Sequence, residues 1–199
     1  MPKVTVIIPV YGHAEYVSDS LGSVFTQSFT DFEVIVINDG STDASECILE
    51  PYINSGKIKY VCQENKGVAA ARNQGLALAS GDLIAFLDDD DVWPNNKLEI
   101  QVDQIENCDA IVVGGSSHGF FDIENADEVS SDPNKFRLLN TIDFFLGNHF
   151  TSPGQVIIRK SALDAIGGYD EAIWGVNDLD LWMRLSRIGE IRKYEYLAL

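Results

Sequence analysis

The sequence has little positive charge, few cysteines and no long apolar run. Fourteen lysines and arginines stand against 31 aspartates and glutamates, so 199 residues carry a formal net charge of −17. So acidic a surface repels nucleic acid and anionic lipid headgroups, and no nucleic-acid partner is expected. The three cysteines lack CxxC spacing and leave one unpaired, which argues against disulfides or a zinc site and for a reducing compartment.

Signals for export, for the membrane and for common phosphate sites are missing as well. No apolar window approaches the length of a transmembrane segment, and the N-terminus does not read as a secretion signal, so we expect a cytoplasmic protein, with a peripheral place at the inner membrane face as the alternative. No GxGxxG or GxxxxGK[ST] occurs where a Rossmann site or a P-loop would need it. Bound phosphates would therefore need another partner, and a cation held by carboxylates could supply it.

The chain does contain an alternation of apolar strands and amphipathic helices. Nearly continuous apolar, β-branched runs predict strands buried on both faces, which are typical of a parallel sheet. The fold class is therefore α/β, a mostly parallel sheet flanked by helices with right-handed crossovers. The strands are expected at 3–10, 32–37, 57–62, 82–87 and 109–114, and the helices at 17–27, 48–53, 67–79 and 98–105.

The pattern changes after residue 114. Residues 116–134 are polar and weakly periodic, which predicts a long loop or an irregular hairpin, and 136–146 look helical. The apolar run at the end of the chain suggests that a C-terminal part is missing. Further elements are expected as a strand at 155–159, a helix at 161–166, a helix marked by Leu181, Leu185 and Ile188, and a strand at 191–197.

Four consecutive carboxylates, Asp88 to Asp91, follow the apolar run at 82–87 without a break. Taken alone they fit a solvated acidic turn as well as a cation site. Their location favours the second, because the carboxyl ends of parallel strands share one edge of a sheet and ligands bind there. Polar segments 9–12 and 38–41 end the first two strands at the same edge, so the three segments predict a crevice.

Six segments around this crevice carry short motifs, at 6–11, 38–43, 65–75, 86–93, 167–171 and 178–185. Together they resemble the inverting glycosyltransferase family 2, in the family's order and over nearly the whole chain. The resemblance implies an A-type glycosyltransferase fold, with a nucleotide-sugar-binding half at 1–114 and an acceptor-binding, catalytic-base half at 115–199 in one compact domain. It implies transfer from a nucleotide-diphosphate sugar, with UDP favoured, to a glycan, lipid-linked or protein acceptor, and Mn²⁺ or Mg²⁺ as cofactor.

The resemblance also implies roles for individual residues of the donor site. Pro9, Val10 and Tyr11 should border the base and ribose, Asp39 should hydrogen-bond the base, and Arg72 should approach the nucleotide. Two of these residues, Asp39 and Arg72, have a plainer alternative that the sequence leaves open. Asp39 fits a turn residue, and Arg72 fits a surface helix arginine paired with an acid.

The acidic run and the proposed base complete the implied site. Asp90 should bind the metal, and Asp88 the ribose or the metal shell. Asp89 stands where the family has a small residue, so ligation could be shared or shifted by one position. Asp178 matches the catalytic base that takes the acceptor's proton. It follows Asn177 where the family has glutamate, and its alternative is a helix N-cap.

Aromatic and histidine residues receive no catalytic role from the sequence. The three tryptophans are interpreted as packing, with Trp174 alternatively lining an acceptor site, and His13, His118 and His149 as structural or surface residues. Two other functions stay open: a sugar nucleotidyltransferase, although its usual basic, glycine-rich loop after the first strand is missing, and a non-catalytic nucleotide-sugar-binding domain. The sequence does not name the sugar, the acceptor or the oligomeric state.

Overall fold

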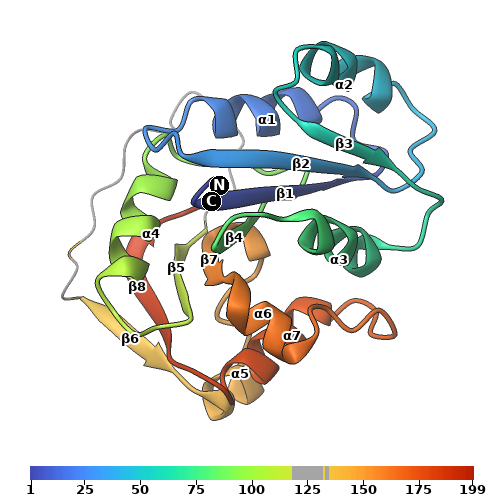
Figure 1. Cartoon of the computed structure of the whole chain (residues 1–199). Helices are drawn as coiled ribbons and strands as arrows, with labels where there is room; N and C mark the ends of the chain where they lie inside the picture. Colours follow the sequence, from blue (N-terminus) through green and yellow to red (C-terminus); the bar gives the residue numbers. More distant parts are fainter. Residues whose placement is uncertain (118–131, 133–134) are drawn as a thin grey trace.

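The computed structural model describes residues 1–117, 132 and 135–199, and an eight-stranded sheet in the order β3-β2-β1-β4-β7-β5-β8-β6 runs through it (Figure 1). Six strands point the same way and β6 and β7 run against them, so the expected mostly parallel sheet is confirmed. The strands are β1 (Val4–Val10), β2 (Phe32–Asn38), β3 (Lys59–Cys62), β4 (Leu83–Phe86), β5 (Val112–Ser116), β6 (Phe136–Leu139), β7 (Val156–Arg159) and β8 (Ile191–Leu197).

Helices cover both faces of the sheet and give three layers (Figure 1). The helices α1 (Val17–Phe25), α2 (Ser45–Asn54) and α4 (Lys97–Glu106) pack on one face, and α3 (Val68–Leu78), α5 (Thr141–Leu146), α6 (Lys160–Ile166) and α7 (Asn177–Leu185) on the other. All seven residues of β1 are buried. Val6 and Ile8 join one hydrophobic cluster and Ile7 the other, because successive strand side chains point to opposite faces. This two-sided burial explains the continuous apolar run in the sequence.

The order of the strands determines where the crevice lies. β2 lies on one side of β1 and β4 on the other, so the chain crosses over at β1. Parallel pairing aligns Val10 with Asn38 and Ile7 with Phe86, and therefore brings the segments after β1, β2 and β4 to one edge. Such a switch point is where open α/β sheets bind ligands.

Several expected boundaries were wrong. Residues 136–146 are not one helix: Phe136–Leu139 pair antiparallel with β8, and Asn140 begins α5 with a capping box in which its side chain accepts the Asp143 N–H and Asp143 accepts that of Asn140. Strand pairing thus overrides local helical character. The final helix ends at Leu185, before Ile188, and β5 is shifted to Val112–Ser116. The loop expected at 116–134 lies largely outside the described residues. Within the described residues, no helix is both long and apolar enough to cross a membrane.

Gly75 explains why one motif of the sequence ends in glycine. In α3, a Cβ at this position would lie 2.4 Å from Cγ2 of Ile7 in β1. We expect Gly75→Ala to lower the free energy of unfolding by about 1–3 kcal/mol through overpacking. Gly22 in α1 has open space around its Cβ position, so Gly22→Ala should instead raise stability by up to about 1 kcal/mol through helix propensity. Urea unfolding of the pair measures this, and equal effects of both substitutions would contradict the close contact.

Candidate active site

A pocket of about 540 Å³ opens at the carboxyl edge of the sheet, where β1, β2 and β4 end. The crevice expected from the sequence is therefore present, and residues 9–11, Asp39 and Asp88–Asp90 share it. Arg72 reaches the pocket from α3, and Trp174 from the segment before α7. The described structure thus brings the predicted donor-site residues together in one cavity.

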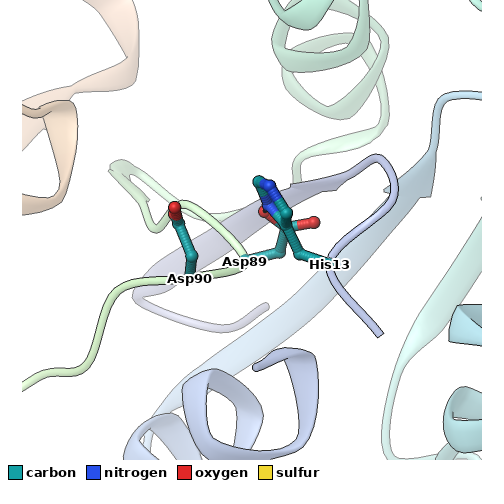
Figure 2. A group of neighbouring side chains, drawn as sticks. All are labelled: His13, Asp89 and Asp90. Carbon is teal, nitrogen blue, oxygen red and sulfur yellow. Dashed lines mark hydrogen bonds and ion pairs between the residues drawn. The ribbon is translucent and has the colours of Figure 1, made fainter. Parts of the chain in front are cut away.

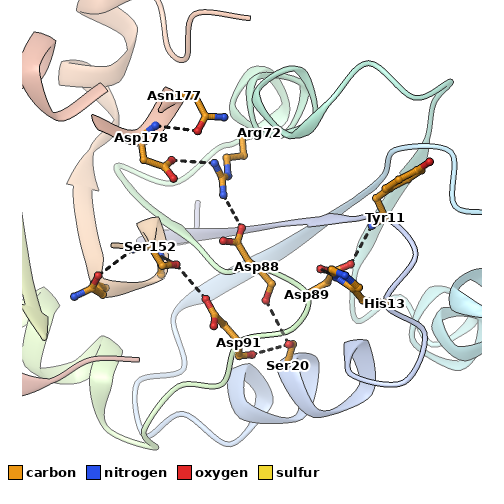
Figure 3. A network of polar contacts seen from close by, with 12 residues as sticks. Tyr11, His13, Ser20, Arg72, Asp88, Asp89, Asp91, Ser152, Asn177 and Asp178 are labelled. Atoms are coloured by element: carbon orange, nitrogen blue, oxygen red, sulfur yellow. Dashed lines mark hydrogen bonds and ion pairs between the residues drawn. The ribbon is translucent and has the colours of Figure 1, made fainter. Parts of the chain in front are cut away.

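The acidic run does not form an open string of charges. The Asp91 backbone N–H donates to the Asp88 carbonyl over 3.1 Å, so the four residues form a turn, and the Ser20 hydroxyl donates to the Asp91 carbonyl over 2.6 Å. A turn directs successive side chains to different sides. As a result, each of the four carboxylates has different neighbours: Figure 3 shows those of Asp88, Asp89 and Asp91, and Figure 2 shows Asp90.

Asp89, the residue without an obvious role in the sequence, is almost fully buried. Its carboxylate accepts the Tyr11 backbone N–H over 3.0 Å and lies 2.8 Å from Nδ1 of His13. Burial raises the pKa of Asp89, while the hydrogen bond from His13 opposes that rise. In return, the hydrogen bond to Asp89 raises the pKa of His13. Asp89 therefore ties the segment after β1 to the acidic turn.

Asp90 is exposed, and its carboxylate forms no hydrogen bond or ion pair within the described residues. Ligand atoms of His13, Asp89 and Asp90 all lie within 4.8 Å of one another (Figure 2). Carboxylate oxygens suit hard divalent cations such as Mg²⁺ or Mn²⁺. The donor set therefore fits such a cation, with Asp90 free to ligate it and Asp89 already engaged by two hydrogen bonds.

Asp88 and Asp178 face each other across one arginine. Arg72 Nη2 lies 2.6 Å from Oδ1 of Asp88, and Arg72 Nη1 lies 2.9 Å from Oδ1 of Asp178 (Figure 3). The guanidinium is buried, with 3% of its side chain exposed, and packs over the Tyr169 ring at 5.1 Å. The alternative of a surface arginine is therefore wrong. Arg72 joins the acidic turn after β4 to the first turn of α7.

Asp178 is not the N-cap of α7. The helix begins at Asn177 after an N-cap at Val176, so Asp178 lies within the first turn. The Asp178 N–H donates to the Asn177 side chain, which occupies the position where the family has glutamate. Burial raises the pKa of Asp178, and the positive charge of Arg72 acts against this rise. A raised pKa brings a carboxylate closer to the range that a general base needs.

Asp91 points away from the cavity, toward the segment before β7. Its carboxylate accepts the Ser152 hydroxyl over 3.0 Å. Burial raises the pKa of Asp91 to about 6, and the nearby charge of Asp88 adds to the rise. The hydrogen bond with Ser152 joins the acidic turn to the segment before β7. Asp91 therefore stabilises the turn and does not line the pocket.

Asp39 at the end of β2 is buried, with 3% of its surface exposed, and holds the loop that leads into α3. Its Oδ1 accepts the Gln63 side chain and the Lys66 N–H, and its Oδ2 accepts the Gly67 N–H over 2.8 Å. The turn itself is held by Asn38, whose side chain accepts the Ser41 N–H. Oδ2 of Asp39 therefore retains an acceptor position for a ligand N–H.

Sequence reasoning missed two residues of this site. His13 was interpreted as structural or surface, but it lines the pocket and contacts Asp89. Trp174 was interpreted as packing, with the lining of an acceptor site as the alternative, but 80% of its surface is exposed and it lines the same pocket as Asp39; Trp93 and Trp182 are fully buried as expected. Neither residue has ligand spacing or periodicity in the sequence that would single it out.

A three-layer α/β fold with an acidic crevice at its switch point is the architecture of A-type glycosyltransferases, and solved structures share it. TarS of S. aureus aligns with a TM-score of 0.78 and 24% identity over 98% of this chain and 60% of the TarS chain. The mannosyltransferase PcManGT of Pyrobaculum calidifontis aligns with a TM-score of 0.72 and 18% identity, over 96% of this chain and 56% of that chain. At these identities the structures establish the fold.

Sequence comparison identifies the family. Residues 5–167 match the family model described as glycosyl transferase family 2, and the chain belongs to that family. An uncharacterized glycosyltransferase of Rickettsia prowazekii is 32% identical over 200 residues, covering 96% of this chain and 60% of the relative. Glycosyltransferase GlyA of Streptococcus pneumoniae is 38% identical over 123 residues, covering 61% of this chain and 18% of GlyA. The chain thus spans about 60% of the Rickettsia relative's length.

Proposed function

We propose that the protein is an inverting glycosyltransferase that moves a sugar from a nucleoside-diphosphate sugar to an acceptor hydroxyl, with a UDP-sugar as the favoured donor. The observation that carries this proposal is the Asp88–Arg72–Asp178 arrangement, in which Arg72 and Asp88 line the pocket and Asp178 pairs with Arg72. It couples a carboxylate of the acidic turn to a half-buried carboxylate that has no capping role. Transfer needs these two functions side by side: a place for the leaving diphosphate and a base for the acceptor.

The relatives support the donor class. TarS has been solved in complex with UDP and with UDP-GlcNAc, and PcManGT with GDP-Man and Mn²⁺. These ligands support a nucleotide sugar and a divalent cation for this chain too, with UDP favoured over GDP in our proposal. A glycan, lipid-linked or protein acceptor, and a cytoplasmic or membrane-peripheral location, belong to the same proposal.

In this reaction we assign a role to the donor-site residues and to Asp178. Pro9, Val10, Tyr11 and Asp39 bind the base and ribose, and Asp90 would hold the cation, with Asp88 and Asp89 beside it. A bound cation would supply Lewis-acid stabilisation of the negative charge on the leaving diphosphate. Asp178 accepts the proton of the acceptor hydroxyl as that oxygen attacks the anomeric carbon. The bond from the anomeric carbon to the diphosphate breaks, and the nucleoside diphosphate leaves.

Calorimetric titration of UDP, GDP and dTDP, each with and without Mn²⁺, tests the proposal. UDP should bind in the presence of Mn²⁺, and Asp90→Asn should weaken that binding at least tenfold, because it removes a charge that ligates the cation. Asp164→Asn is the control, since Asp164 pairs with Lys160 on the surface, outside the pocket. Its affinity should equal that of the wild type.

A product assay with UDP-GlcNAc, run beside the titrations, separates the alternatives. Release of UDP from UDP-GlcNAc in the presence of Mn²⁺ supports an enzyme that cleaves the sugar–phosphate bond. Tight UDP-sugar binding without any release would instead favour a non-catalytic nucleotide-sugar-binding domain. Cleavage between the two phosphates would favour a nucleotidyltransferase. A wild-type protein that binds no nucleoside diphosphate in Mn²⁺ would rule out the donor site itself.

A further inference from the structure

Trp174 differs from the other tryptophans in its surroundings. Trp93 and Trp182 are fully buried, whereas 80% of the surface of Trp174 is exposed. A single exposed apolar side chain is common on proteins and needs no explanation by itself. The position of Trp174 is informative, because the indole forms part of the wall of the 540 Å³ pocket.

The indole lies at the Asp39 end of that pocket. A Cβ built on Gly67 would be 3.7 Å from Cη2 and 3.9 Å from Cζ2 of Trp174, so the edge of the ring lies over Gly67. The N–H of Gly67 donates to Oδ2 of Asp39 over 2.8 Å. Gly67 therefore lies between the two groups: it faces the edge of the ring, and its N–H binds the one carboxylate oxygen of Asp39 that keeps an acceptor position free.

The segment that carries Trp174 is anchored to α3. Asn73 holds the Tyr169 backbone from both sides, accepting its N–H over 2.8 Å and donating to its carbonyl over 3.0 Å. Asn73 also donates to the Glu171 side chain over 2.8 Å. Gly175 follows the tryptophan with a φ of +76°, a conformation that favours glycine. The indole is thus held near Gly67 by the fold rather than by its own burial.

The walls at this end of the pocket suit a flat, partly apolar group. Pro9, Val10, Tyr11 and Val68 provide apolar surface, and Asp39 is the carboxylate among them. An aromatic ring with four fifths of its surface open can stack on a planar heterocycle, and Asp39 can accept an N–H from the same heterocycle. A nucleobase has both properties.

We propose that Trp174 covers the nucleobase of the donor and is a binding residue for the nucleoside part of the substrate. This inference rests on the proposed function, because it requires a nucleotide sugar in the pocket. Stacking of a base on an aromatic side chain commonly strengthens binding by about one to two orders of magnitude in affinity. Loss of the indole should therefore weaken nucleotide binding without changing the binding of phosphates alone.

Titrations in the presence of Mn²⁺ test the inference. The ligands are UDP, uridine and pyrophosphate, and the proteins are the wild type, Trp174→Ala and Trp174→Phe. Trp174→Ala should raise the Kd for UDP and for uridine about tenfold and leave that for pyrophosphate unchanged, since pyrophosphate has no base. Trp174→Phe should stay within about threefold of the wild type, because the phenyl ring still stacks. All three proteins should be equally stable, since the side chain is exposed.

Tryptophan fluorescence gives a second measurement on the same samples. Because Trp93 and Trp182 are buried, UDP should change mainly the emission of Trp174, and the change should vanish in Trp174→Phe while UDP still binds. If Trp174→Ala binds UDP as tightly as the wild type, the inference is wrong and the donor site still stands. An equal loss of affinity for pyrophosphate also contradicts it. Absence of UDP binding to the wild type would reject the proposed function and this inference together.

Discussion

Replacing Asp178 by asparagine should lower the rate of UDP release from UDP-GlcNAc by about 10²–10⁴-fold, the usual contribution of a general base. Asparagine has nearly the same shape, and its side-chain carbonyl oxygen can still accept a hydrogen bond from Arg72, whose Nη1 lies 2.9 Å from Oδ1 of Asp178. It cannot take up a proton. The affinity for UDP should therefore remain within about twofold of the wild type, and the free energy of unfolding should fall by only about 1 kcal/mol.

The pH dependence of the rate provides a further check on this assignment. Protonation of Asp178 should abolish wild-type activity on the acid side, and burial raises the pKa of this group, so the loss should begin at a higher pH than for an ordinary aspartate. The residual activity of Asp178→Asn should lack this acid limb. If Asp178 had only a structural role, the Asp178→Asn variant would still lose activity at low pH as the wild type does.

Asp180→Asn is the matched control for Asp178→Asn. Asp180 lies two residues further along α7, but it pairs with Arg184 at 2.7 Å, on the same helix. This substitution should change the rate by only a few-fold. Near-wild-type turnover in Asp178→Asn would show that Asp178 is not the base, and a large loss in Asp180→Asn would transfer the role to Asp180.

The sequence revealed the edge of the sheet that forms the pocket, for a physical reason. Strands such as Val4–Val10 are buried on both faces, so their continuous apolar character is visible without any structure. Parallel strands then place their carboxyl ends together, which predicted that Tyr11, Asp39 and Asp88 would be neighbours. Both steps depend only on local pattern and topology.

Contacts between distant parts of the chain were not visible in the same way. Arg72 meets Asp178 across 106 positions, and His13 meets Asp89 across 76. No sequence periodicity indicates such pairs. For this reason the sequence left open that Arg72 is a surface arginine, and His13 was interpreted as a structural or surface residue. The helix expected at 136–146 failed for a related reason, because pairing of Phe136–Leu139 with β8 decides the structure of its first part.

Arg72→Met should lower both stability and activity. Arg72 is the buried cation between Asp88 and Asp178, and removal of one partner from a buried ion pair costs about 3–5 kcal/mol, because it leaves uncompensated charges. UDP release should fall at least tenfold, since neither carboxylate is then held in place. Arg72→Lys should also be impaired, because a single ammonium cannot replace two guanidinium nitrogens that each contact a different carboxylate.

A surface pair supplies the control for this loss of stability. Lys160 and Asp164 form an i,i+4 pair at 2.8 Å with the aspartate side chain 53% exposed. Lys160→Met should therefore change the free energy of unfolding by less than about 0.5 kcal/mol. If Arg72→Met costs no more than this in urea unfolding, the buried ion pairs do not contribute as the geometry indicates.

A double-mutant cycle between Arg72→Met and Asp178→Ala isolates the contact between Arg72 and Asp178, because alanine leaves no oxygen that could accept a hydrogen bond from the guanidinium. Residues in direct ionic contact show coupling energies of about 0.5–3 kcal/mol, whereas independent sites add. A positive coupling in both unfolding free energy and UDP release would mean that the base is oriented by the same arginine that holds the acidic turn. Additive effects would mean that Arg72 acts on the acidic turn and on Asp178 independently, and that another group orients Asp178. The coupling energy thus decides whether the donor side and the base act as one unit.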